Sequence, residues 1–512
     1  MLDTSNSNNY EYTTKHLELH ILGGLKTNKL ESLRITISVQ KPNQHNILRH
    51  SIDLYNDNQV EKFTRKIAER LEIGTSVARK TLQELTHELE NYRFLLLDEY
   101  EKQHQPYFKE LSATELRAAE AFLKKDNLLK RTNKLIGEAG VIGEENNRQT
   151  MFLIFTSRKT NNPLHCISLG NSGTGKTHLQ TKVSELIPEE DKIEITVLSA
   201  NAFYYFNRTE LQHKLILIED LDGAESVLYP LRELQSKKRI TKTVVHKDTK
   251  GNTKTIHLTV EGPVSVGGCT TQEHIYEDNS NRSFLLYIDE SEVQDQKIMD
   301  YQRLISAGKV NTEQEHKAKE LLKNVQRILK PIKVINPFAE HLQLPKSVFK
   351  PRRTNSHYLQ FIEAITFYKQ YQRIKKYDET TGEEFIETTI EDIEEANELI
   401  IDVLLRKSDT ITGATRNHLE SLKEYLKANN QITFTSSEVR RKLRLKESTL
   451  RNYNKQLLLE GYIKKVKAEK GKMYHYEIID IDEYTNLKSQ INKSLQDCIT
   501  KINLASSQVV RK

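Results

Sequence analysis

Eight consecutive residues combine glycines, a lysine and a threonine at a fixed spacing: Gly170, Asn171, Ser172, Gly173, Thr174, Gly175, Lys176 and Thr177. They match the pattern G-x-x-x-x-G-K-[ST] at every position. Glycines tolerate positive φ angles, so the backbone can wrap closely and aim its N–H groups at one centre. This geometry predicts a site for the phosphates of ATP, in which Lys176 reaches the outer phosphates and the Thr177 hydroxyl ligates Mg²⁺.

The residues on either side supply the strand and the helix that such a loop needs. Residues 164–169 are a short apolar run with β character, and the residues from His178 to 186 have the pattern of a helix that ends before Pro188. The phosphates are therefore expected at the positive end of that helix, close to His178. The alternative is a glycine-rich turn that matches the pattern by accident.

Carboxylates end a second apolar run, at 215–218. Glu219 and Asp220 follow it directly, and Asp222 lies close behind. The run resembles a Walker B motif, a buried parallel strand that delivers acids to its carboxyl end, where α/β sheets place their ligands. We expect Glu219 to help hold Mg²⁺ and Asp220 to polarise the attacking water. How these three acids divide the work is left open, and a purely structural acidic strand end is the alternative.

Composition restricts the classes of protein to consider. The chain has 512 residues, of which 37% are hydrophobic and 29% charged, and its net charge is +6; a chain of this length should form about three or four globular domains. The apolar runs are short, and the N-terminal residues lack the features of a signal peptide, which predicts a cytoplasmic protein without membrane contact. Cys166, Cys269 and Cys498 are too widely spaced to predict a zinc site or a disulfide framework.

Residues 1–108 are predicted to form an accessory domain of α+β type. Alternating apolar residues predict three strands and helical spacing predicts two helices, at 17–25, 33–39, 47–54, 58–71 and 76–92. Residues 71–85 could be a helix-turn-helix, for which ordinary helix packing is the alternative. A polar stretch around Pro106 is the expected linker.

Lysines gather on a segment with strand periodicity between residues 240 and 260. Thr, Val and Ile alternate there with Lys and His on both sides of a turn at 250–251, which predicts a β-hairpin. An exposed two-stranded ribbon is marginally stable, and clustered positive charge does not stabilise it further. The charge suits contact with phosphate backbones, so DNA binding is predicted for Lys242, Lys247, Lys250 and Lys254. A solvated hairpin is the alternative.

The order of these parts resembles that of a known family. The chain resembles the AAA+ ATPases with a pre-sensor β-hairpin, such as minichromosome-maintenance helicases. The resemblance lies in the order of a phosphate loop, an acidic strand end, a helix over 224–237, a basic hairpin, a strand over 264–269 and an arginine before the strand 284–288. Residues 218–224 and 229–234 also resemble the helicase part of the toprim, zinc-finger primase-helicases of bacterial integrated mobile elements. The chain has neither zinc-binding cysteine pairs nor an acidic toprim constellation, so primase activity is not implied.

This resemblance implies roles for individual residues. Thr270 or Thr271 corresponds to sensor 1, which contacts the γ-phosphate or orients the attacking water. Arg282 corresponds to an arginine finger supplied to the ATP of a neighbouring subunit. Arg353, together with Arg352, corresponds to the sensor 2 arginine at the head of a helical lid.

The predicted AAA+ core covers residues 109–330, and three further parts follow it. Residues 331–405 should hold the helical lid, with a helix over 355–371, and an acidic connector whose last helix is capped near Thr389. Residues 413–480 have the element order of a winged helix, with helices at 414–428, 437–443 and 448–460. Residues 481–512 are predicted to be a helical tail with a frayed basic end.

Positive charge is concentrated in the predicted winged helix. Residues 436–475 hold 12 Lys or Arg against 4 Glu, a net charge of +8. A helix in the major groove with a basic wing on the backbone needs such a layout, which predicts DNA contacts by Arg440, Arg441, Arg451, Lys455, Lys464 and Lys465. A protein-interaction module is the alternative.

These parts predict an α/β protein with an AAA+ P-loop core, a parallel sheet, an accessory domain and a winged helix. The predicted activity is ATP- and Mg²⁺-dependent unwinding or remodelling of DNA in mobile-element replication. A homo-oligomeric ring, with a hexamer favoured, and a primase or another replication protein as partner would fit that activity. The alternatives are a non-translocating initiator or loader that binds DNA through the winged helix, and a regulator whose ATPase remodels proteins.

Overall fold

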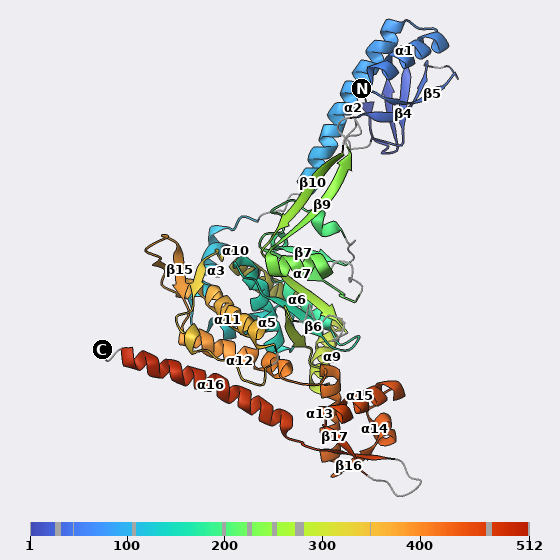
Figure 1. Cartoon of the computed structure of the whole chain (residues 1–512). Helices are drawn as coiled ribbons and strands as arrows, with labels where there is room; N and C mark the ends of the chain where they lie inside the picture. Colours follow the sequence, from blue (N-terminus) through green and yellow to red (C-terminus); the bar gives the residue numbers. More distant parts are fainter. Residues whose placement is uncertain are drawn as a thin grey trace. The chain divides into compact units, whose positions relative to one another are not determined.

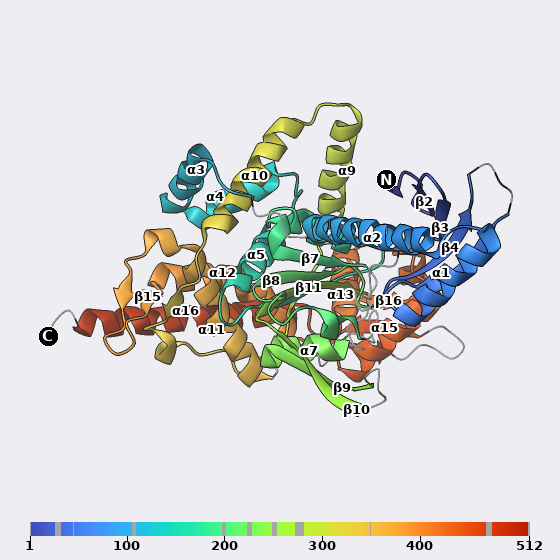
Figure 2. The same ribbon diagram turned by 90° about the horizontal axis from the view of Figure 1, so that it is seen from above.

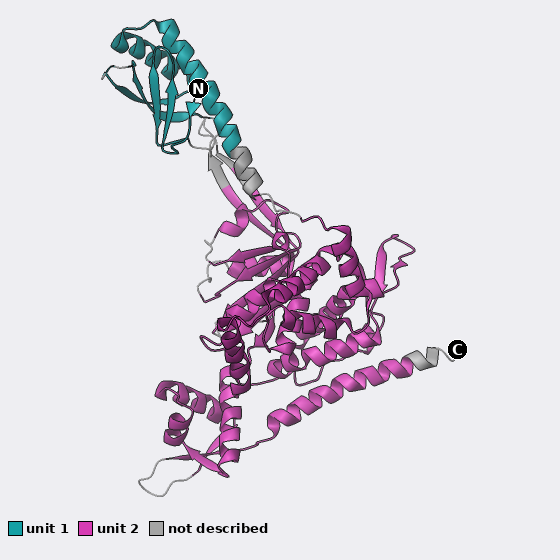
Figure 3. Ribbon diagram, turned by 180° about the vertical axis from the view of Figure 1, so that it is seen from behind, with its two compact units in different colours: residues 1–108 teal, residues 109–512 magenta. Residues whose placement is uncertain are grey.

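The chain forms two compact units, residues 1–108 and 109–512, which Figure 3 colours separately. The computed structural model describes residues 2–25, 32–42, 44, 46–104, 109–196, 201–222, 228–247, 253–271, 281–348, 350–466 and 474–509. Among these residues, no helix is long and apolar enough to cross a membrane.

The first unit is an antiparallel sheet with two helices. Its described residues form strands in the order β1-β2-β3-β4-β5, each paired with the next along the chain. The elements are β1 (Leu2–Asp3), β2 (Asn9–Thr13), β3 (Glu18–Leu22), β4 (Arg34–Gln40), β5 (Leu48–Asp53), α1 (Asp57–Leu71) and α2 (Thr75–His104). One face of the sheet is buried with the helices, so buried residues alternate with more exposed ones along β2 and β3. β2 was not predicted, because tyrosines at positions 10 and 12 form its buried face within a polar segment.

The second unit contains a parallel sheet. Its described strands are ordered β12-β6-β11-β8-β7, and all of their pairings are parallel. The elements of this part are α3 (Ala113–Lys124), α4 (Leu128–Glu138), α5 (Glu145–Thr156), β6 (His165–Leu169), α6 (Lys176–Ser184), β7 (Lys192–Ile195), β8 (Lys214–Ile218), α7 (Leu228–Lys237), β11 (Val264–Thr270), β12 (Phe284–Tyr287), α9 (Glu292–Ser306) and α10 (Thr312–Ile328). Figure 2 shows α9 standing out from the sheet beside α10.

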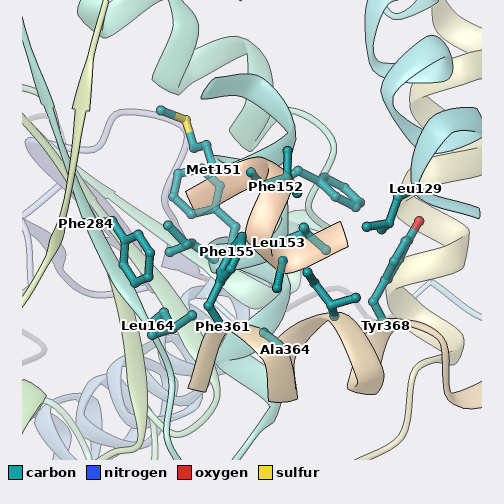
Figure 4. Packing of buried hydrophobic residues seen from close by; sticks show 14 of the residues in the cluster. Leu129, Met151, Phe152, Leu153, Phe155, Leu164, Phe284, Phe361, Ala364 and Tyr368 are labelled. Atoms are coloured by element: carbon teal, nitrogen blue, oxygen red, sulfur yellow. The ribbon is translucent and has the colours of Figure 1, made fainter. Parts of the chain in front are cut away.

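The core of this unit is built around α5. Residues 148–156 of this helix are all buried, because it lies between the sheet and α11 (Pro351–Tyr368). Figure 4 shows Phe152 and Phe155 of α5 among Phe284, Phe361 and Tyr368. Close packing also explains a glycine in β11, because a Cβ atom at Gly267 would lie 2.9 Å from the Phe155 ring.

Three of the helices after residue 331 belong to the same core. The elements are β13 (Lys333–Ile335), α11, β14 (Lys376–Tyr377), β15 (Glu384–Glu387), α12 (Ile390–Lys407) and, near the end of the chain, α16 (Glu483–Val509). Buried residues of α11, α12 and α16 join the cluster that contains α5, and α16 lies along α12 in Figure 1. The predicted C-terminal helix is thus long and packed, and residues 510–512, at the end predicted to be frayed, lie outside the described residues. α11 begins at Pro351, four residues earlier than predicted, because proline suits the first turn of a helix.

One carboxylate of the predicted acidic connector, that of Asp392, is buried, while most of the other acids there are exposed. Thr389 caps α12 as predicted, in a capping box with Asp392. Asp392 is 0% exposed, and it lies 3.2 Å from the Nζ atom of Lys369, which is 1% exposed. Arg373 donates to the same carboxylate. Asp392 therefore neutralises buried positive charge in the interior of the unit.

Replacing Asp392 with alanine should destabilise the second unit strongly. Breaking a buried ion pair typically costs about 3–5 kcal/mol of unfolding free energy. Glu395 remains 2.6 Å from the Lys369 Nζ atom, so a loss near the lower end, about 3 kcal/mol, is expected. Glu391 provides the matched control, because it is 63% exposed and lies 3.4 Å from the same Lys369 Nζ atom. Glu391→Ala should cost less than about 1 kcal/mol. Thermal melting of the full chain measures both, and equal shifts for the two variants would contradict a stabilising role of the buried pair.

Residues 413–478 form helices around a small sheet. The elements are α13 (Gly413–Ala428), β16 (Thr433–Thr435), α14 (Ser436–Lys442), α15 (Glu447–Leu459), β17 (Ile463–Val466) and β18 (His475–Ile478). The described strands are antiparallel in the order β16-β18-β17. These elements have a separate buried cluster that includes Leu419, Phe434 and Leu457. The predicted turn at 470–471 lies outside the described residues.

Candidate nucleotide site

The predicted phosphate loop joins β6 to α6. α6 begins at Lys176, and its N-cap is Gly175, which has a φ of +92°. Gly173 has a φ of +85°, so both positions favour glycine. Within the described part of the chain, no side chain caps the first turn of α6. Its N–H groups and the positive end of the helix dipole therefore suit an anion.

Lys176 lies back over this loop. Its side chain is 8% exposed, and its Nζ atom donates to the carbonyl oxygens of Gly170 at 2.9 Å and Asn171 at 2.5 Å. The Thr174 hydroxyl also donates to the Asn171 carbonyl oxygen, at 2.9 Å. A cation is thus held directly at the loop. Ser172, Thr177 and His178, which were predicted to contact the nucleotide, are exposed nearby.

The strand order brings the predicted catalytic residues to one edge of the sheet. β11 lies between β6 and β8, with Thr270 opposite Leu169 and Gly268 opposite Ile218. The strands are parallel, so the loop after β6, the end of β11 and the acids after β8 share the carboxyl edge.

Cys269 shows which side chains are close to one another at this edge. Burial raises the pKa of its thiol to about 12, while the Thr177 hydroxyl and the charge of Lys176 act to lower it and the charge of Asp220 adds to the rise. The Cys269 thiol thus lies within hydrogen-bonding reach of the Thr177 hydroxyl, the predicted Mg²⁺ ligand. Glu219, which directly follows β8, is exposed.

Asp222 is already engaged by the two predicted sensor threonines. It accepts hydrogen bonds from the hydroxyl of Thr270, from the hydroxyl of Thr271 at 2.8 Å and from the Thr271 N–H at 3.2 Å. Its own N–H donates to an Asp220 oxygen at 2.9 Å. Asp222 thus joins the ends of β8 and β11, which leaves Glu219 and Asp220 as the accessible carboxylates of this group.

The donor set at this edge fits Mg²⁺ bound together with phosphate. Among the described residues, no group of three or more His, Cys, Asp or Glu side chains could hold a metal ion. Mg²⁺ is commonly held by one or two protein oxygens together with phosphate oxygens and water. The Thr177 hydroxyl and one carboxylate are compatible with that mode of binding.

One residue at the loop was not predicted. The carboxylate of Glu290, just beyond β12, accepts hydrogen bonds from the N–H and the side-chain amide of Asn171, at 2.7 and 2.8 Å. In the sequence, this glutamate is one of many acids before a helix, and 119 residues separate it from Asn171. No local pattern could have identified it.

Arg282 and Arg353 lie at the other edge of the sheet. They line a pocket of about 220 Å³ together with His165, the first residue of β6. The phosphate loop follows the last residue of β6, about 13 Å away at ~3.3 Å per residue. The structure therefore does not bring Arg353 to the phosphate loop of its own chain. Arg353 lies in the first turn of α11, and Arg282 donates to the Ser236 hydroxyl at 2.9 Å.

The charges of this pocket are all positive. Lys238 also lines it, and no carboxylate is present among its described lining residues. Burial lowers the pKa of His165 to about 3, and burial together with the nearby Lys407 lowers the pKa of His357 to about 3. Both rings are therefore neutral near pH 7. His165 is 6% exposed, and its Nδ1 atom has no hydrogen-bond partner among the described residues. The pocket can accept an anion.

The predicted hairpin is present and exposed. It consists of β9 (Arg239–Lys247) and β10 (Thr253–Glu261), which pair along their whole length and extend beyond the parallel sheet (Figure 1). Ile240 and Val260 anchor its base in a buried cluster. The Nζ atom of Lys242 lies 5.6 Å from the centre of the Tyr204 ring. Lys250 and the side chains of Lys247 and Lys254 lie outside the described residues.

A second basic surface follows the helices at 436–459. One groove of about 750 Å³ is lined by four of the six residues predicted there: Arg440, Arg451, Lys455 and Lys465. Arg440 is paired with Glu447 at 3.0 Å. Arg441 and Lys464 are also exposed but do not line this groove; Lys464 pairs with Glu477 at 3.0 Å.

Comparisons with known proteins point to the same class of domain as the phosphate loop does, a P-loop domain. Residues 113–331 match the family model described as the MTBMA_p00010 P-loop domain. With the parallel sheet, the loop after β6 and the helix that follows it, this match shows a P-loop NTPase core, a fold that binds nucleotides. A search of curated proteins gives no significant match.

Three solved structures illustrate what the chain is similar to. A full-length MCM homologue from Methanopyrus kandleri matches with 13% identity and a TM-score of 0.37, over 59% of this chain and 63% of that one. Drosophila ORC bound to DNA matches with 12% identity and a TM-score of 0.23, over 75% and 96%. The apo C-terminal region of NrS-1 matches with 13% identity and a TM-score of 0.22, over 74% and 77%. The chain thus spans less than two thirds of the MCM homologue.

Proposed function

We propose that this protein is an AAA+ ATPase that uses ATP and Mg²⁺ to unwind or remodel DNA, and that it works as a homo-oligomeric ring. One observation carries the proposal. The phosphate loop and the accessible carboxylates share one edge of the sheet, while the arginine pocket lies at the opposite edge of the same chain. A complete hydrolysis site would therefore combine two copies of the chain.

One copy would supply the residues that bind ATP. The N–H groups of the loop and Lys176 would hold the phosphates, and Thr177 with Glu219 or Asp220, the accessible carboxylates at the same edge, would help hold Mg²⁺. When bound, Mg²⁺ neutralises charge that develops on the phosphates. Glu219 or Asp220 would then orient the attacking water, and Thr270, held by Asp222, would line the same edge.

A second copy would supply its arginine pocket. Arg282 would act as the arginine finger towards the neighbour's γ-phosphate, and Arg353 would assist it, since the two line one pocket without a carboxylate among its described lining residues. Repetition of such a head-to-tail contact closes into a ring when the rotation between copies allows. We favour a hexamer.

DNA would bind at the hairpin and at the basic groove. An exposed ribbon that extends beyond the sheet suits contact with a phosphate backbone, and such contact is sensitive to salt. The groove of residues 436–465 is the feature that supports a winged helix and, as a second candidate function, an initiator or loader that does not translocate. The resemblance of the sequence supports mobile-element replication as the setting, with a primase or another replication protein as partner.

Charge reversal at Lys242 tests the role of the hairpin. Lys242→Glu should weaken binding of single-stranded DNA several-fold, and it should reduce the slope of log affinity against log salt by about one for each phosphate that is no longer neutralised. Lys309→Glu, on the exposed turn between α9 and α10, makes the same charge change elsewhere and is the control. Fluorescence anisotropy at several salt concentrations measures both. Equal losses for the two variants would argue against the hairpin as the DNA contact.

Stimulation of ATP hydrolysis by DNA tests the proposal as a whole. Hydrolysis by the full chain should require Mg²⁺ and should increase several-fold when single-stranded DNA is added. Hydrolysis that is independent of DNA at every salt concentration would instead favour a protein-remodelling ATPase.

A further inference from the structure

A carboxylate is in direct contact with the loop that is suited to phosphates. Glu290 receives the N–H of Asn171 on Oε1 at 2.7 Å and the amide Nδ2 of Asn171 on Oε2 at 2.8 Å. The first glycine of the loop permits this approach, because a Cβ atom at Gly170 would lie 3.1 Å from Glu290 Oε1. Both carboxylate oxygens are thus committed to one residue of the loop.

The residues on either side of Glu290 hold it in this place. The N–H of Asp289 donates to Glu144 at 2.7 Å, and the N–H of Ser291 donates to the side chain of Asp289 at 2.9 Å. Ser291 is the N-cap of α9 and accepts from the N–H of Gln294, whose buried side chain donates to the Ile142 carbonyl oxygen at 3.0 Å. The position of Glu290 is therefore set by the start of α9.

The two charged groups at the loop have opposite consequences for a polyphosphate. Lys176 attracts phosphate, but its Nζ atom is engaged by the Gly170 and Asn171 carbonyl oxygens. Glu290 stabilises that arrangement by fixing Asn171 through its N–H and its side-chain amide, and its negative charge repels an incoming anion. Repulsion between like charges grows with the charge of the ligand and is stronger where solvent is partly excluded.

We propose that Glu290 is a positioning residue that holds the phosphate loop through Asn171 and weakens nucleotide binding, most strongly for the nucleotide with the most phosphates. This inference rests on the proposed function, because it concerns nucleotide binding at the same loop. The segment between β12 and α9 thus controls nucleotide affinity. A movement of α9 that drew Glu290 away from Asn171 would raise that affinity.

Titration of nucleotides into the full chain tests this role. The variants are Glu290→Gln, which keeps an amide oxygen as acceptor and removes the charge, and Glu290→Ala, which removes the contact. Glu292→Gln is the matched control, because it removes an equal charge from an exposed position two residues away. Calorimetric titration with AMP, ADP and ATP in the presence of Mg²⁺ gives the dissociation constants, and thermal melting shows that each variant is folded.

We expect Glu290→Gln to bind ATP about five- to tenfold more tightly than the unmodified chain, with a smaller gain for ADP and almost none for AMP, as expected of a repulsion between charges. A merely structural role would change the three ligands alike. Glu292→Gln should leave all three constants unchanged. If the unmodified chain binds ATP and Glu290→Gln binds it equally or less tightly, the inference is overturned while the proposed function stands. If the unmodified chain binds no nucleotide, the proposed function itself is overturned.

Discussion

Replacing Lys176 with alanine is expected to lower the rate of ATP hydrolysis by at least about 100-fold, the loss typical when one preorganised donor to transition-state charge is removed. Lys176 is nearly buried against the loop, and its Nζ atom is already at the carbonyl oxygens of Gly170 and Asn171. A shift from these carbonyl oxygens to phosphate oxygens would bring the charge to the outer phosphates. No other residue of the eight in the loop carries a positive charge.

Phosphate release under saturating ATP measures this effect. Lys182→Ala is the control, because Lys182 lies on the same helix and pairs with Glu185 at 3.5 Å, away from the loop. This control should keep most of the activity. Comparable rates for Lys176→Ala and the unmodified chain would place the chemistry at a different site.

Replacing Arg282 with alanine is expected to lower hydrolysis by about 10³-fold, the lower end of what an arginine finger contributes. The reason is the separation between the arginine pocket and the loop within one chain, which requires the guanidinium to act on a neighbour. Folding should be preserved, since Arg282 is only half-buried and donates to the Ser236 hydroxyl near the surface.

Mixing two inactive variants tests whether the site is shared. Lys176→Ala lacks the phosphate-binding lysine, and Arg282→Ala lacks the finger, so some contacts in a mixed assembly would pair an intact loop with an intact arginine. ATP hydrolysis should therefore increase when the two variants are mixed, and each variant alone should stay nearly inactive. If no ratio restores hydrolysis, Arg282 does not act between subunits.

The nucleotide site could be predicted to the extent that it depends on residues close together in the sequence. Gly173 and Gly175 adopt the positive φ angles that their spacing implied, and α6 starts at the lysine between the predicted strand and helix. The acids after β8 reach the expected edge because strand ends follow directly from a buried apolar run.

Contacts between distant residues could not be predicted. Glu290 meets Asn171 only because β12 lies beside β6. Asp392 stands in a run of acids that looks solvated, but the Thr389 cap turns it inward towards Lys369. Arg353 was predicted, by resemblance to a sensor 2 arginine, to help bind the nucleotide, and the start of α11 carries it to the amino end of β6, away from the phosphate loop of its own chain. In each case, the deciding information is which elements pack together.

Strand separation on a forked DNA duplex tests the central claim most directly. The full chain should separate the strands with ATP and Mg²⁺, and it should fail with a non-hydrolysable ATP analogue or when Lys176 is replaced by alanine. A chain that binds the fork and hydrolyses ATP but leaves the duplex intact would contradict a DNA motor, and it would favour a nucleotide-controlled initiator or loader.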